Sequence, residues 1–465
     1  MRRGAAGTLI AAIVAMLAAS CTSASPSPWP RDRYQAEEIH IISGADSSIS
    51  PGNSPVVLGE PGMYEQLVNY WNKYEEPRFG FGVELDVVPG GATAEHSEML
   101  AAAQTGGSQY DIYNLDSQWV PEFADDGYIM PLQGRVGERP FLTRPLLSAE
   151  ASGQLYAVPF TTDVGLLYYR SDLVTKAELR NLNRRSFGAL ISLARSVMGR
   201  HPAGITEGYA GQFASYEGLT VNALEAIWSR DPTAFSSDGT IDDNAKVTAG
   251  LQDLVNAFAP LGQAPAVIRP AELTYQEEQA FADFASGQAV FMRNWPIYYD
   301  KLAAQRPSSE QAVADFGVEP LPFPSALGGQ DLAISAGSPD PHEALEVVNF
   351  LTSQAAERCL FAVGGFPATR ASAYAQNGSL PQGAVGRPSL CGTKALQEVK
   401  IGGTILTALK SAIPRPSTRY YTVFTTVLQD QVHEMLKDHV QAAATERTLA
   451  TDLISASTGH APPDG

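Results

Sequence analysis

The carboxylates best placed to do chemistry stand at the ends of expected strands and helices. Asp116 follows a buried strand, Asp163 lies in a Thr-Thr-Asp turn, and Glu217 follows Tyr216 at an expected helix start. Carboxylates held in this way accept hydrogen bonds from hydroxyl groups in fixed directions, and such charged bonds are stronger than neutral ones. Purely structural roles are the alternative to ligand binding. Asp116 could cap the next helix, and Glu217 could do no more than interact favourably with the helix dipole.

Aromatic and arginine side chains supply the complementary chemistry. Trp295, which follows Asn294, is the expected stacking plate, and Phe366 is a second candidate. Arg370 and Arg415 can each donate a fork of hydrogen bonds to neighbouring hydroxyls. The backbone of Arg415 is stiffened by a proline on each side. Burial in the core is the competing role for both aromatic residues.

Tyr216 and Asn294, the neighbours of Glu217 and Trp295, are also expected to contact the ligand. Gly329 and Gln330 complete the candidate set, because glycine lets the backbone approach a ligand closely. A sugar offers apolar C–H faces and a rim of hydroxyls, so it needs an aromatic plate together with carboxylates, amides or arginine. A micromolar site requires about −8 kcal/mol. A few charged hydrogen bonds and one plate are sufficient for that affinity.

The sequence gives little support to the hypothesis of an enzyme, because common catalytic motifs are absent. The chain has no Gly-x-Ser-x-Gly, no His-Glu-x-x-His and no phosphate-binding loop, and its seven histidines are scattered. We therefore expect no metal and no cofactor. A carboxylate pair for glycoside hydrolysis, formed by Asp116 with Asp163 or Glu217, stays an alternative, because the separation of two carboxylates is a three-dimensional quantity.

The N-terminus has the pattern of an export signal. Arg2 and Arg3 precede an apolar run over 9–19 that is too short to span a membrane, and small residues lead to Cys21. This ending resembles the lipobox of bacterial lipoproteins, in which the cysteine is acylated and becomes the new N-terminus. The prediction is a signal peptide over 1–21 and a lipid anchor at Cys21. A plain signal peptide with an incidental cysteine is the alternative.

Composition narrows the possible partners. The chain carries 50 acidic against 32 basic side chains, a net charge of −18. Such a surface repels nucleic acid and anionic membranes. With 44% hydrophobic residues, the chain is long enough for two lobes. Once Cys21 is acylated, Cys359 and Cys391 form an even pair, so a disulfide is expected in an oxidising compartment, with two separate thiols as the alternative.

The order of elements predicts an α/β fold. Strands are expected over 38–43, 83–88 and 111–115, with helices over 63–74 and 95–105 between them. This alternation favours a mostly parallel sheet that binds ligands beyond the carboxyl ends of its strands. Residues 22–35 are expected to be a disordered tether and 456–465 a disordered tail. The second half is expected to be mainly helical, over 187–198, 217–230, 245–259, 275–285, 342–354, 394–411 and 420–440.

Five segments in order resemble the extracellular solute-binding proteins of bacterial ATP-driven (ABC) importers, in their family 1 carbohydrate-binding branch. Each segment alone is weakly specific, but together they extend over most of the chain from about 38 to 440. The segments are 111–132, with Asp116, Trp119 and Phe123; 156–173; 284–295; 328–335 with the return through 364–370; and 414–421.

This resemblance implies a two-lobed fold of the periplasmic-binding-protein type (class II), with a hinge and a ligand cleft between the lobes. The first lobe is expected at 36–159 plus 322–372, and the second at 160–321 plus 373–455. By resemblance, ligand contacts fall at the lobe crossing near Asp163 and in the C-terminal segment with Arg415.

The resemblance also implies a function. The protein would be a monomeric lipoprotein on the outer face of the cell membrane that captures a sugar or oligosaccharide and delivers it to a membrane permease. It would not be an enzyme. Three alternatives stay open: the same fold binding a polyol, osmolyte, amino sugar or peptide, a secreted glycosidase or lyase, and a lipoprotein that binds its ligand for signalling.

Overall fold

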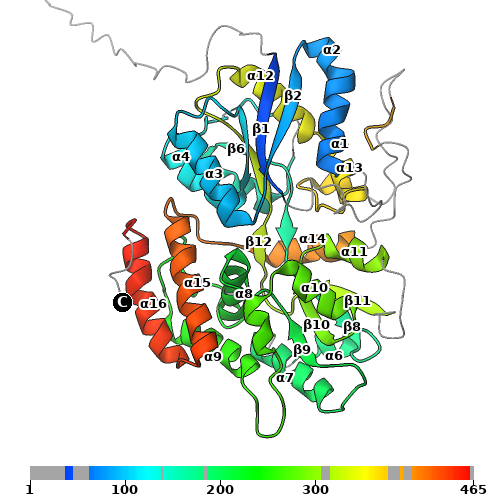
Figure 1. Ribbon diagram of the computed structural model, residues 1–465, viewed down its shortest axis with the longest axis vertical. Helices are drawn as coiled ribbons and strands as arrows, with labels where there is room; N and C mark the ends of the chain where they lie inside the picture. The colour runs from blue at the N-terminus through cyan, green and yellow to red at the C-terminus, as the bar shows by residue number, and fades with distance from the viewer. Residues whose placement is uncertain are drawn as a thin grey trace, which may run out of the picture.

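The structure, a computed structural model, forms two lobes that are drawn one above the other in Figure 1, each built around its own sheet. The predicted signal peptide, Cys21 and the tether lie outside the described residues. No helix among those residues is both long and apolar enough to cross a membrane. The described residues are 37–45, 62–132, 134–137, 140–182, 186–304, 315–374, 388–391 and 401–460.

Lobe 1 contains a five-stranded sheet. Its strands, in sheet order, are β2 (Gly82–Val88), β1 (Glu38–Gly44), β3 (Ile112–Asp116), β13 (Gln330–Ile334) and β6 (Ala157–Pro159). The prediction of a mostly parallel sheet is confirmed for lobe 1, because β2, β1, β3 and β6 run in one direction. The exception is β13, which runs antiparallel to both β3 and β6. The cause is topological: β13 returns from lobe 2 and enters at the carboxyl end of β3, where Gln330 pairs with Asp116.

Lobe 2 has a four-stranded sheet in which only β10 and β9 are parallel. Its strands, in order, are β11 (Phe316–Pro320), β8 (Leu166–Arg170), β10 (Ala289–Asn294) and β9 (Glu207–Ala210). Between the lobes lies a three-stranded crossover sheet of β14 (Ile413–Pro414), β12 (Ala326–Gly328) and β7 (Asp163–Val164). Three separate passages of the chain therefore join the lobes, as the resemblance implied, although the exact lobe boundaries stay a prediction.

The helices of lobe 1 pack against its sheet, with Ile39, Ile41 and Ile112 fully buried beneath them. The first expected helix extends from α1 through a π-helical turn over Trp71–Glu75 into α2, because Trp71 is buried and its indole N–H donates to the Phe81 carbonyl. A short hairpin of β4 (Glu150–Ala151) and β5 (Gln154–Leu155) follows α5. The helices are α1 (Met63–Tyr70), α2 (Glu76–Phe79), α3 (Ala92–Gln104), α4 (Val120–Asp125), α5 (Thr143–Ser148), α12 (Pro341–Leu351) and α13 (Gln354–Ala362).

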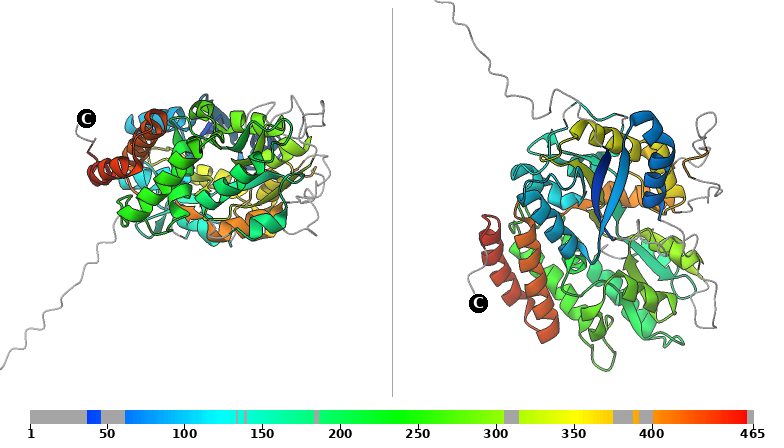
Figure 2. Two further views of the ribbon diagram at one scale, coloured as in Figure 1. Left: turned by 90° about the horizontal axis from the view of Figure 1, so that it is seen from below. Right: turned by 45° about the horizontal axis from the view of Figure 1, so that its top comes forward.

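In lobe 2, side-chain caps fix several helix starts. The Ser186 hydroxyl accepts from the Ala189 N–H, and the Asp243 carboxylate accepts from the Lys246 N–H. The last two helices pack side by side on the outer face of the lobe in every view (Figures 1 and 2). The helices are α6 (Lys176–Arg180), α7 (Phe187–Met198), α8 (Glu217–Trp228), α9 (Asn244–Phe258), α10 (Glu277–Ala285), α11 (Tyr298–Ala304), α14 (Gly402–Ser411), α15 (Tyr421–Asp438) and α16 (Ala442–Ala456).

The expected helices are present, with ends that differ by a few residues, except that α14 begins at Gly402 and residues 392–400 lie outside the described chain. The predicted tail over 456–465 starts too early. The end of α16 is ordered because Leu453 and Ala456 are buried, and the helix ends at Ala456 with Ser457 as its C-cap. Of the predicted tail, residues 461–465 lie outside the described residues.

Cys359 and Cys391 form a disulfide, with a Cα–Cα distance of 5.0 Å. Cys359 lies in α13, whose start is capped by the Ser353 hydroxyl, and Cys391 belongs to the segment that leads toward α14. Both cysteines are fully buried. The bond thus ties the end of the lobe 1 fold to the chain that leaves it for lobe 2.

Candidate functional site

The interlobe cleft holds a cavity of about 440 Å³. Its wall combines the carboxyl end of β3, the starts of α3, α8 and α10, and the crossover sheet. Nine of the eleven predicted ligand-binding residues line it: Asp116, Asp163, Tyr216, Glu217, Trp295, Gly329, Gln330, Phe366 and Arg415. Residues about 300 positions apart in the sequence therefore share one cavity.

Arg415 connects the two lobes inside this cleft. Its Nη1 donates to Glu217 Oε1 at 2.5 Å, and its Nη2 donates to Asp116 Oδ1 at 3.2 Å. Asp116 ends β3 in lobe 1, whereas Glu217 begins α8 in lobe 2. Because a guanidinium presents its donors as a rigid fork, Arg415 fixes the relative position of the two carboxylates.

Glu217 is held on all sides by donors. Its Oε1 also accepts from the Tyr421 hydroxyl, and its Oε2 accepts from the Thr425 hydroxyl at 2.7 Å. Both partners lie on α15, which packs against α8. The helix cap is not made by Tyr216, whose side chain makes no capping bond. Glu217 therefore does more than interact with the dipole of α8: its bonds to α15 hold the C-terminal segment against the cleft.

The electrostatics of this cluster follow from burial. Burial raises the pKa of Asp116 above its ordinary value, Arg415 opposes that rise, and Glu217 adds to it. Burial would lower the pKa of Arg415, but Asp116, Tyr421 and Glu217 raise it above its ordinary range. Arg415 thus stays charged, and Asp116 becomes protonated at a higher pH than an exposed aspartate would.

Trp295 offers one ring face to the cleft. Its other face is covered by the Arg293 guanidinium, whose Cζ lies 3.8 Å from the ring centroid. Arg293 is in turn fixed by two bonds to Glu225, of 3.0 and 2.9 Å. The indole N–H points to Glu277 Oε1 at 3.3 Å. The ring is therefore held at its back and edge, and only its front is available for stacking.

Asn294 is a correction to the predicted set. It is fully buried and does not line the cleft. Its Oδ1 accepts from the Trp295 N–H at 2.9 Å, and its Nδ2 donates to the Glu277 carbonyl at 3.1 Å. Asn294 therefore positions the two cleft residues Trp295 and Glu277 and has no surface left for a ligand.

Gly329 turns the chain from the crossover sheet into β13. Its φ is 127°, and a Cβ at this position would lie 2.3 Å from the Thr161 carbonyl oxygen. Only glycine fits this close approach. The neighbouring Gln330 shares a 2.5 Å bond with the Thr161 hydroxyl, so its amide is directed along the cleft wall. Asp163 lies opposite Gly328 in the crossover sheet.

Arg370 is the second correction. It is 1% exposed, and its Nε donates to the Thr352 carbonyl at 2.9 Å and to Glu357 at 3.0 Å, while its guanidinium covers Phe141. It therefore belongs to a buried ion pair of lobe 1 and not to the cleft. Phe366 lines the cleft but is mostly buried in the core.

Three carboxylates that line the cleft were not predicted from the sequence. Glu277 and Glu278 lie in the first turn of α10, and Glu95 lies in the first turn of α3 after Gly90 and Gly91. The signal that could have found them is the one that found Glu217, because all of these carboxylates stand in the first turn of a helix.

A possible metal ligand set lies elsewhere. Within the described residues, Glu38, His40 and Glu84 bring their ligand atoms within 4.8 Å of one another, with Asp86 also near the imidazole. They stand on the outer surface of β1 and β2 and are largely exposed. An exposed acidic group of this kind is common without a metal, and it is not part of the cleft.

Comparison with known proteins gives the family. A family model described as "Bacterial extracellular solute-binding protein" matches residues 60–358. The chain belongs to this family. The match begins just before α1, after β1, includes the whole lobe 2 sheet and ends in α13. It therefore contains every predicted residue that lines the cleft except Phe366 and Arg415.

Relatives of this family member agree with the two-lobed architecture. A Deinococcus radiodurans protein named "Probable ABC transporter-binding protein" is 30% identical over 275 residues, which cover 57% of this chain and 60% of that protein. The chain thus matches less than two thirds of that relative. Maltose-bound MalE3 of T. maritima is 27% identical, with a TM-score of 0.70 over 90% of this chain and 99% of that one. The GacH receptor of Streptomyces glaucescens shares the fold at 19% identity, with a TM-score of 0.68 over 92% of this chain and 100% of that one.

Proposed function

We propose that this solute-binding protein captures a sugar or a short oligosaccharide in the interlobe cleft. The observation that carries the proposal is the single free face of Trp295 in a cavity that also holds Asp116 and Glu217. The free ring face stacks on the apolar side of a sugar, while the carboxylates accept from its hydroxyls. The similarity to a maltose-bound protein at 27% identity supports the same ligand class.

Binding without turnover is the function that the cleft geometry favours. Glycoside hydrolysis needs two carboxylates with the scissile bond between them. Arg415 occupies that space between Asp116 and Glu217 and bonds to both. The described structural relatives bind maltose and acarbose, which also favours a binder.

Delivery to an ABC permease completes the proposal, and the named relative from Deinococcus radiodurans supports it. We propose that Cys21, acylated after removal of the signal peptide, tethers a monomer to the outer face of the cell membrane. Mass spectrometry of the protein from membranes tests the tether: it should show a diacylglyceryl group on Cys21, and an unmodified N-terminus after an earlier cleavage site would overturn it.

The ligand class is tested by a thermal-shift screen of the purified protein against mono-, di- and trisaccharides, polyols, amino sugars and amino acids. Ligand at 100 times its Kd adds about 2.7 kcal/mol to stability, which raises Tm by a few degrees. A rise with one sugar that is recovered unchanged supports the proposal. A response only to a non-sugar class would overturn the carbohydrate assignment, and product formation would overturn the assignment as a binder.

A further inference from the structure

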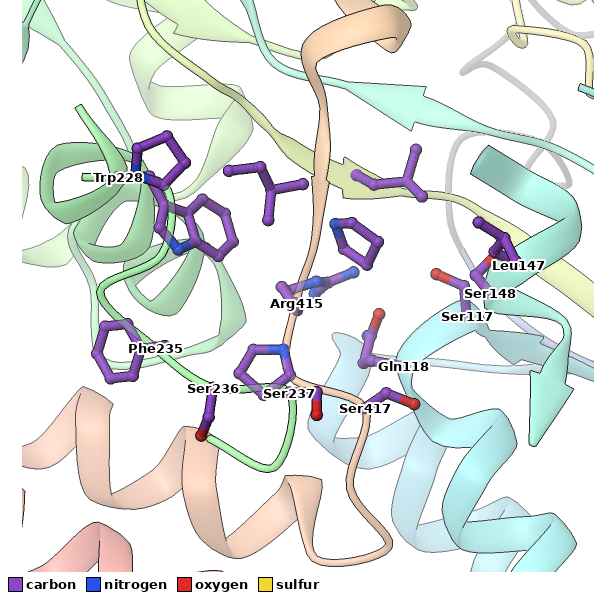
Figure 3. A pocket seen from close by; sticks show the side chains of 15 residues that line it. Ser117, Gln118, Leu147, Ser148, Trp228, Phe235, Ser236, Ser237, Arg415 and Ser417 are labelled. Atoms are coloured by element: carbon purple, nitrogen blue, oxygen red, sulfur yellow. The ribbon is translucent and has the colours of Figure 1, made fainter. Parts of the chain in front are cut away.

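A second cavity, of about 330 Å³, lies on the other face of the crossover sheet (Figure 3). Leu327 of β12 lines this cavity, whereas the next residue, Gly328, lines the interlobe cleft. Successive strand residues point to opposite faces, so the two cavities lie back to back. We call the second cavity the back pocket; its walls come from lobe 1 at Gln118, from lobe 2 at Trp228 and Phe235, and from the chain around Arg415.

Some buried polar atoms in the back pocket lack a hydrogen-bond partner within the described part of the chain. They include Oε1 of Gln118, an acceptor, and Nε of Arg415, a donor. The two residues are only 5% and 6% exposed. A buried donor or acceptor without a partner destabilises a fold, so natural structures rarely leave one. Here an acceptor and a donor line one cavity, which points to a ligand that carries both kinds of group.

The remaining walls define the rest of that ligand. Trp228, Phe235 and Leu327 supply apolar surface, and serines such as Ser237 supply hydroxyls. Arg415 is the only charged side chain among the described residues of the wall, and Asp116 and Glu217 already balance its charge. A charged ligand would therefore find no counter-charge. A cavity of this volume is at the small end of ligand sites and suits about one six-membered ring.

We propose that the back pocket is a second ligand site, which binds one uncharged, hydroxylated six-membered ring such as a monosaccharide or a cyclitol. The ring lies against Trp228 and Phe235, donates a hydroxyl hydrogen to Gln118 Oε1, and accepts from Arg415 Nε. This site is separate from the interlobe cleft and does not depend on the ligand assigned to it, although both cavities use Arg415.

The test measures the binding of two probes, myo-inositol and D-glucose, by saturation-transfer NMR. All measurements are made in a Trp295→Ala background, which removes the stacking plate of the interlobe cleft. Ser237→Trp fills the back pocket from an exposed position, and Gln118→Leu removes the acceptor at similar size. Ser286→Trp, on the exposed end of α10, is the matched control for an added tryptophan.

We expect a millimolar Kd for at least one probe, as is usual for ligands of about twelve heavy atoms. Binding should weaken at least tenfold with Ser237→Trp and with Gln118→Leu, and stay unchanged with Ser286→Trp. Circular dichroism checks that each variant is folded, and either back-pocket variant alone suffices for the comparison. Absence of binding by both probes up to about 50 mM would overturn the proposal, as would binding that neither back-pocket variant weakens.

Discussion

At the scale of single residues, the cleft is organised by arginines that hold other side chains in place. Arg293 fixes the back of the Trp295 ring, and Arg415 fixes Asp116 against Glu217. Neither guanidinium has to move when a sugar enters, because each is already bonded to a carboxylate. Binding therefore loses little side-chain entropy, which is the condition for useful affinity from a few contacts.

Replacing Trp295 tests directly whether the ligand stacks on its ring. We expect Trp295→Ala to weaken sugar binding at least tenfold, about 1.4 kcal/mol, because stacking on the free ring face is lost. Trp295→Phe should retain part of the affinity. Isothermal titration calorimetry gives the Kd of each variant, with Tm as the check on folding. Unchanged affinity in a folded Trp295→Ala protein would place the ring among the core residues.

Asp116 should make sugar binding depend on pH. Because burial raises its pKa above the ordinary 3.8, the carboxylate becomes protonated at a higher pH than an exposed aspartate would. As pH falls through that raised pKa, an acceptor and a partner of Arg415 are lost together, so affinity falls. We expect the Kd to be constant well above that pKa and to rise several-fold as Asp116 becomes protonated. Asp116→Asn should bind weakly and show a flatter pH profile; an unchanged profile would assign the effect to another group.

At the scale of elements, the segment between α13 and α14 depends on the disulfide. Closing a loop with a sequence separation of 32 residues stabilises the fold by about 3–4 kcal/mol in the chain-entropy model. We expect the Cys359→Ser, Cys391→Ser double variant to lose about that much in urea unfolding. Its sugar affinity should stay unchanged, because neither cysteine lines the cleft. A reducing agent should destabilise the wild type and leave the double variant unaffected.

The local sequence pattern was sufficient to predict most helices and strands and most of the residues that line the cleft. The alternation of Ile39 and Ile41 and the helical spacing around Leu67 express burial directly, so β1 and α1 were predictable. Helix starts and strand ends also predicted Asp116 and Glu217, because such ends meet at a sheet edge. The partners of these residues were not predictable, since the bonds from Arg415 join positions that are brought together only by the complete fold.

The features that the sequence did not predict share one cause. The direction of β13, the core position of Arg370 and the ordered end of α16 are all decided by packing between segments that are distant in sequence. An arginine whose guanidinium binds a ligand cannot be told by its local sequence from one, such as Arg370, whose guanidinium binds Glu357. The burial of Glu357, which raises the pKa of this carboxyl to about 8, becomes visible only in the assembled lobe.

At the scale of the whole molecule, we expect ligand to bring the lobes closer together. Ligand changes the balance between open and closed forms only if it contacts both lobes more fully in one of them. The cleft meets this condition, because Asp116 belongs to lobe 1 and Trp295 to lobe 2. Small-angle X-ray scattering should show a smaller radius of gyration at a sugar concentration close to the wild-type Kd, and little change for Trp295→Ala at that concentration. An unchanged radius in the wild type, with binding verified, would show that capture occurs without closure.

The order of strands in the lobe 1 sheet has a consequence for how the chain folds. β13 lies between β3 and β6 but follows β6 in sequence by about 170 residues, and all of lobe 2 up to β12 intervenes. Until β13 arrives, the facing edges of β3 and β6 are unpaired, and unpaired edges invite aggregation. Such distant pairing also slows folding. Neither lobe can be completed as an independent unit during synthesis, so the protein's most vulnerable state is the chain that ends just before β13.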